Sequence, residues 1–167
     1  YIRMAPEPTF DLLLTGGVVI DGSGAPAYLA DVAILGDRIA DVSAEPLDPS
    51  VARRVVDVTG LVVSPGFVDI HTHLDPLLRL PGAESHVRQG VTTALGGPDG
   101  GGVWPFGDHL VAVADTGIGM NVGFLVGHNT VRREVMGLAN RAPTPAELGR
   151  MQGMIAQAME EGAWGIS

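Results

Sequence analysis

Short apolar runs separated by glycine-containing turns fill the first third of the chain. The runs that we expect to form strands are residues 10–20, 30–34, 38–42, 55–58 and 61–63. Glycine pairs with Asp, Ser or Thr lie between them at 21–24, 36–37 and 59–60, and residues of these types favour tight turns. Residues 16–17, both glycine, split the first run. The pattern predicts a small antiparallel β unit over 10–64, with 59–60 as a hairpin-like turn.

From residue 65 onward, strand patterns alternate with helix patterns. The expected strands are 66–70, 91–95, 121–126 and the start of another at 163–166, and the expected helices are 83–89, 106–114 and 144–161. The last helix has the clearest start, because Thr144 and Glu147 match a capping box and Pro145 occupies the favoured first position. Strands that alternate with helices imply parallel βα units.

Four strands with three helical connections amount to half of a (β/α)₈ barrel, which typically needs about 250 residues. Four parallel strands cannot close into a barrel. The region from 65 to 167 is therefore either a small open sheet or one part of a barrel whose remainder lies elsewhere.

Composition removes several classes of function. The net charge of −9, with 19 acidic and 10 scattered basic residues, argues against nucleic acid, whose phosphates require clustered Lys and Arg. The absence of cysteine excludes disulfides and thiolate metal sites. No segment approaches the roughly 20 apolar residues that cross a bilayer, so we expect no membrane partner. Residues 1–9 lack a signal-peptide pattern, which favours the cytoplasm; a signal already removed would leave a periplasmic or secreted location open.

The most informative side chains follow the apolar run at 66–70. His71 and His73 are two positions apart at the end of a strand, so both imidazoles should project to the same side. Two neutral imidazoles on one face form half of a site for a divalent transition metal. In the alternative interpretation one His is solvated and the other packs. The position favours the metal site, because barrel enzymes place catalytic groups at the carboxyl ends of strands.

The sequence around this pair also resembles a known family. Residues 64–75 (SPGFVDIHTHLD) closely resemble the first-strand signature of the metal-dependent amidohydrolase superfamily. The segments that resemble further parts of the superfamily, and of its N-acyl-D-amino-acid deacylase branch, are residues 10–40, 58–63, 89–93, 127–137 and 162–167. The resemblance extends over essentially the whole chain, and its first-strand motif is the most specific part.

That resemblance implies the fold and the chemistry. The fold would be α/β, the first half of a distorted (β/α)₈ TIM barrel (65–167) preceded by part of a small β-sandwich (10–64) and an N-terminal extension (1–9). The activity would be hydrolysis of a small-molecule amide, such as an N-acyl-D-amino acid or a D-residue dipeptide, by water activated on one or two zinc ions. His71 and His73 would bind the first metal. A cyclic amide or imide hydrolase, a deaminase and a non-catalytic fragment are the alternatives.

One position departs from the deacylase branch. The branch usually has a cysteine ligand after its second strand, whereas Asp99 occupies the aligned position here. A carboxylate suits zinc or a harder metal and can bridge two ions, so Asp99 is the candidate third ligand. Equally, Asp99 could cap its own backbone in a glycine-rich turn.

Two further residues are candidates for contact with ligand or substrate. Asp75 could orient a ligating His or the substrate amine, or it could be a solvated loop acid. His128, at the end of the third expected barrel strand, could contact substrate or an oxyanion, or it could pack against backbone. The general base and further histidines of the family cannot be located in this chain.

A half-barrel that stops at Ser167 would leave an open strand edge and a large apolar face exposed. We therefore expect a second polypeptide that carries strands five to eight, produced from the same precursor and starting with Thr or Ser. Self-cleavage beside that hydroxyl, ordinary proteolysis and a deliberately divided chain would all leave the same end.

Overall fold

The structure is a computed structural model that describes residues 9–74 and 76–167. The chain divides into two compact units between Pro65 and Gly66, and each is described by itself. Within the described residues, no helix combines the length and apolar character needed to cross a membrane.

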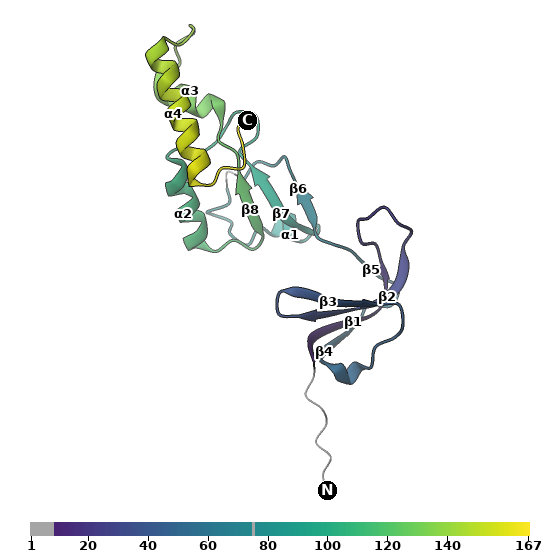
Figure 1. Cartoon of the computed structure of the whole chain (residues 1–167). Helices are drawn as coiled ribbons and strands as arrows, with labels where there is room; N and C mark the ends of the chain where they lie inside the picture. Colours follow the sequence, from purple (N-terminus) through teal and green to yellow (C-terminus); the bar gives the residue numbers. More distant parts are fainter. Residues whose placement is uncertain (1–8, 75) are drawn as a thin grey trace. The chain divides into compact units, whose positions relative to one another are not determined.

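The first unit is a five-stranded sheet with a short 3-10 helix at Pro49–Val51 (Figure 1). Its strands are β1 (Phe10–Val19), β2 (Tyr28–Leu35), β3 (Arg38–Ser43), β4 (Ala52–Asp57) and β5 (Val62–Val63). The order is β3-β2-β1-β4, and β5 also pairs with β1. The β1–β2 and β2–β3 pairs are antiparallel as predicted, but β4 and β5 both run parallel to β1. The prediction of a purely antiparallel unit with a hairpin at 59–60 was therefore wrong.

The glycine pair in β1 explains this arrangement. Gly16 has a φ of +71°, and a Cβ there would lie 2.6 Å from Thr59 Oγ1. At Gly17, a Cβ would lie 2.7 Å from Val63 Cγ2. The two glycines form an irregularity in β1 that leaves room for the turn at 58–61. After that turn, β5 pairs with the same edge of β1 as β4 does. The chain therefore continues in the direction of β4 and does not reverse.

The second unit contains three parallel strands in the order β6-β7-β8. Its elements are β6 (Phe67–Asp69), α1 (Glu84–Val87), β7 (Val91–Gly96), α2 (Phe106–Thr116), β8 (Asn121–Phe124), α3 (His128–Met136) and α4 (Pro145–Glu161). The predicted alternation of parallel strands and helices is confirmed. The strand expected at 163–166 is present only as a bridge between Val126 and Ile166, flanked by a hydrogen bond from Trp164 N to Phe124 O of 2.9 Å.

Helix α4 begins as its sequence predicts, whereas α3 was not anticipated. The hydroxyl of Thr144 accepts from Glu147 N, and the Glu147 carboxylate accepts from Thr144 N, which completes the capping box. Helix α3 has no side-chain cap at Gly127 and is short and strongly polar. Its helical conformation therefore depends on tertiary packing, in which Val131 is fully buried.

Helices α2, α3 and α4 lie on one side of the second unit's sheet (Figure 1). The core there includes Val113 from α2, Val131 from α3, Met151 and Ala158 from α4, and Phe124 from β8. Other apolar side chains of the second unit stay exposed: Phe67, Val68, Ile70 and Trp164 are each at least 63% accessible. Because the strands are parallel, their carboxyl ends meet at one edge of the sheet, and that edge holds the candidate site.

Candidate metal centre

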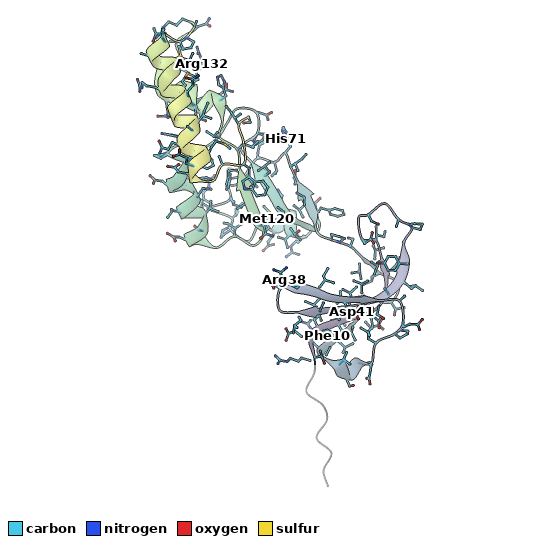
Figure 2. All side chains as sticks on the ribbon, in the orientation of Figure 1. Phe10, Arg38, Asp41, His71, Met120 and Arg132 are labelled. Atoms are coloured by element: carbon cyan, nitrogen blue, oxygen red, sulfur yellow. The ribbon has the colours of Figure 1, made fainter. Side chains whose placement is uncertain are left out.

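The predicted metal ligands come together where β6 and β7 end. His71 and His73 follow β6, and Asp99 lies in the loop that follows β7. Figure 2 shows His71 beyond the end of the strands. Among the described residues, these three form the group of acidic and His side chains that could hold a metal ion, and one candidate ligand atom from each lies within 4.8 Å of the others.

A single carboxylate oxygen faces both imidazoles. Asp99 Oδ2 lies 3.5 Å from His71 Nε2 and 3.3 Å from His73 Nε2. Two ligands bonded to one zinc ion at about 2.0–2.2 Å in tetrahedral directions stand about 3.3–3.6 Å apart. The donor types and both separations therefore fit a zinc-like ion, and the side chains, each more than 60% exposed, leave room for further ligands.

The backbone of Asp99 is unusual for a residue with a side chain. Its φ is +59°, in the left-handed region that Asp and Asn tolerate better than most residues. Gly97 and Gly100 on either side also have positive φ, at +79° and +74°. The tight loop turns the Asp99 carboxylate toward the two histidines. Asp99 thus lies in a glycine-rich turn with its carboxylate facing the two imidazoles, and its role as a ligand stays a prediction.

Thr72, between the two histidines, is held by both backbone and side chain. Its N–H donates to Leu95 O over 3.3 Å, which continues the pairing of β6 with β7. Its hydroxyl lies 3.1 Å from Nε2 of His86, which is part of α1. Sequence reasoning assigned His86 no role, because nothing in a spacing of fourteen positions indicates this contact.

A cavity of about 230 Å³ adjoins the site. His73 and Asp99 line it together with Leu78, Phe124 and His109. The His109 ring packs edge-on against Phe124 with centroids 4.8 Å apart, and burial lowers the pKa of His109. Sequence reasoning also missed His109, because its helical setting showed no link to the strand ends.

The two remaining candidates have different outcomes. Asp75 lies outside the described residues. His128 is the exposed first residue of α3 and not the end of a strand, and its backbone N–H donates to Ser167 O over 2.9 Å. It is not part of the three-residue group. A contact between His128 and substrate stays a prediction.

Comparison with known proteins places this geometry in a family. A model of the Amidohydrolase family matches residues 54–167. D-aminoacylase of Alcaligenes xylosoxydans xylosoxydans is 40% identical across 95% of this chain, and N-acyl-D-aspartate deacylase of the same organism is 36% identical across 94%. This chain spans 37% and 36% of their respective lengths.

Solved structures agree. A crystal structure of D-aminoacylase superposes with a TM-score of 0.86 at 40% identity, covering 94% of this chain and 38% of that one. N-acyl-D-glutamate deacylase from Bordetella bronchiseptica, complexed with zinc and a phosphonate inhibitor, gives 0.86 at 33% identity, covering 95% and 38%. The relatives hold the matching segment within one longer chain, so they give no support to a separate second polypeptide.

These matches account for the parallel βα units of the second unit. The fold is the N-terminal part of the TIM-barrel fold of D-aminoacylase, as predicted. The chain is similar to N-acyl-D-amino-acid deacylases and belongs to the amidohydrolase family.

Proposed function

We propose that the complete protein containing this segment hydrolyses the amide bond of N-acyl-D-amino acids with the help of a bound divalent metal ion. The observation that carries the proposal is the convergence of two imidazole nitrogens and one carboxylate oxygen at the carboxyl ends of β6 and β7. Such a set of nitrogen and oxygen donors suits zinc and neighbouring transition metals.

The proposal assigns a task to each residue of the cluster and to Thr72. His71 and His73 act as neutral ligands through Nε2, and Asp99 contributes negative charge through Oδ2. When bound, the metal lowers the pKa of water and polarises the amide carbonyl. Thr72 keeps the two His backbones in register with β7 through its bond to Leu95. The remaining ligands and the general base come from outside this segment, in the part of the barrel that the longer relatives contain.

The substrate class is supported by three relatives that cover almost the whole chain at 36% to 40% identity. They are named for D-amino acids: D-aminoacylase and the N-acyl-D-aspartate and N-acyl-D-glutamate deacylases. An L-hydantoinase matches at 19% identity, which supports the shared fold alone. An adenine deaminase matches only 55% of the chain. The cyclic-amide, deaminase and non-catalytic alternatives are therefore not favoured.

The test uses the complete protein. We expect purified protein to contain one or two equivalents of zinc or a similar metal by elemental analysis. It should release free amino acid from N-acetyl-D-amino acids much faster than from their L enantiomers. Treatment with a chelator should abolish turnover, and added Zn²⁺ should restore it. Metal-free protein that hydrolyses these amides at the full rate, or metal-loaded protein that hydrolyses none of them, would contradict the proposal.

A further inference from the structure

The loop that carries Asp99 is fixed by a side chain from a distant part of the sequence. The hydroxyl of Ser167 donates to Gly97 O over 2.6 Å and accepts from Gly100 N over 3.1 Å. These two bonds attach to the loop on opposite sides of Asp99. Ser167 is partly buried next to the bridge that continues β8, and its own N–H donates to Val126 O over 3.1 Å. Its position is therefore set by the sheet and not by the loop.

The start of α3 holds the same loop from another direction. The side-chain amide of Asn129 donates to Asp99 O over 3.2 Å, and its backbone N–H donates to Gly100 O over 3.0 Å. Thr130 Oγ1 donates to Gly102 O over 3.1 Å. The carbonyl groups of Asp99, Gly100 and Gly102 thus each accept a hydrogen bond from the first turn of α3.

Close packing leaves this loop little freedom to move. A Cβ at Gly100 would lie 2.5 Å from Asn129 Nδ2, and one at Gly97 would lie 2.6 Å from Leu125 O. A Cβ at Gly127 would overlap the carbonyl oxygens of Gly100 and Gly101. The glycines allow the loop to rest directly on α3 and β8. Within the loop, Gly101 N donates to Pro98 O over 3.1 Å and closes a turn with positive φ at Asp99 and Gly100. The contacts with α3 and Leu125 hold that turn in place.

We propose that Ser167, assisted by Asn129, is a positioning residue that holds Asp99 Oδ2 at metal-binding distance from His71 and His73. The inference rests on the proposed function, since it assumes that Asp99 binds the metal. Without the Ser167 hydroxyl, Gly97 O and Gly100 N lose their shared partner, and the loop can relax toward conformations in which the carboxylate turns away. Loss of such outer contacts typically lowers metal affinity about tenfold to hundredfold.

The test measures zinc affinity by competition with a chelator in the complete protein. Ser167→Ala should weaken binding about tenfold or more. Ser167→Thr keeps the hydroxyl and should retain most of the affinity. Thr116→Ala is the matched control, because it removes a hydroxyl that donates to Ala112 O within α2, over 2.7 Å. If Ser167→Ala does not fold, Asn129→Ala, which removes an exposed side chain, is measured in its place.

A double-mutant comparison separates positioning from general stability. If Ser167 acts through Asp99, Ser167→Ala should change the affinity little in an Asp99→Ala background. Unchanged affinity in the single variant, or an equal loss in both backgrounds, would overturn the proposal. A wild-type protein that binds no zinc would instead contradict the proposed function. The absorption spectrum of the Co²⁺-substituted protein gives a second readout, since displacement of a carboxylate ligand alters it without any turnover.

Discussion

The hydroxyl of Thr72 lies 3.1 Å from His86 Nε2, so the residue between the two candidate histidine ligands is connected to α1. His86 also lies 3.3 Å from Ser85 Oγ through its other ring nitrogen. The peptide of Thr72 is bonded to Leu95 as well. Thr72 is therefore held through both its side chain and its backbone, and His71 and His73 flank it. This reduces the conformational entropy that is lost when a metal ion orders the two histidines.

Thr72→Val tests this anchor, because it preserves the shape of the side chain and removes the hydroxyl. A typical hydrogen bond contributes about 1 kcal/mol, or roughly fivefold in an equilibrium constant. We expect zinc affinity to fall by about that factor, as measured by chelator competition. Ser85→Ala is the control, since it removes the other contact of His86 and leaves the Thr72 bond in place. Equal affinity in wild type and Thr72→Val would show that the anchor is irrelevant to the metal.

Removal of either imidazole should have the largest effect. His71→Ala or His73→Ala leaves two of the three donors, so we expect loss of metal at this site by elemental analysis. Turnover should fall by orders of magnitude, because the water and carbonyl lose their activating ion. The thermal stability of the metal-free protein should change little, since both side chains are more than 60% exposed. Retained zinc with near-normal turnover in His71→Ala would refute the ligand assignment.

Local sequence patterns predicted the features that depend on residues close together in the sequence. His71 and His73 were recognisable because they follow a compact apolar strand, and the start of α4 because Thr144 and Glu147 form a capping box. The direction of β4 was not predictable in the same way. It depends on the glycine irregularity in β1, which accommodates the turn near Thr59, and that contact joins residues more than forty positions apart.

Contacts between residues distant in the sequence also explain why parts of the site were not predicted. Asp99 became a candidate ligand only through the position of a cysteine in related proteins, and the structure brings its Oδ2 to 3.3 Å from His73 Nε2. The contacts of Ser167 with the Asp99 loop join residues 67 and 70 positions apart. A lone serine or histidine carries no periodic signal, so such partners become visible only when the strand ends are brought together.

Substitutions at Asp99 can separate its role as a ligand from its role in the turn. Glycine accepts a φ of +59° without strain, whereas alanine there costs about 1 kcal/mol or more. If the carboxylate binds metal, Asp99→Gly and Asp99→Ala should both lose zinc affinity, and only Asp99→Ala should also lower the melting temperature of the metal-free protein. If Asp99 only shapes the turn, Asp99→Gly should keep full affinity. Titration with zinc and thermal unfolding of both variants decide between the two.

The contacts of Glu147 with Arg141 and with Thr144 should make the stability of the protein depend on pH. Hydrogen bonds from the Arg141 guanidinium, and then from Thr144, hold the pKa of Glu147 well below its ordinary value of 4.5. The folded chain therefore binds this proton less tightly than the unfolded chain, so the carboxylate stabilises the fold fully above about pH 5 and progressively less as the pH falls. Glu147→Gln removes this contribution.

We expect the difference in free energy of unfolding between wild type and Glu147→Gln to be constant from pH 7 to about pH 5 and to shrink toward pH 3. Urea unfolding followed by circular dichroism at a series of pH values measures it. Glu160→Gln, in the last turn of α4, is the matched control, since it removes a carboxylate from the same helix outside the capping box. A difference that stays constant down to pH 3, or one that grows there, would show that Arg141 and Thr144 do not stabilise the charged form of Glu147.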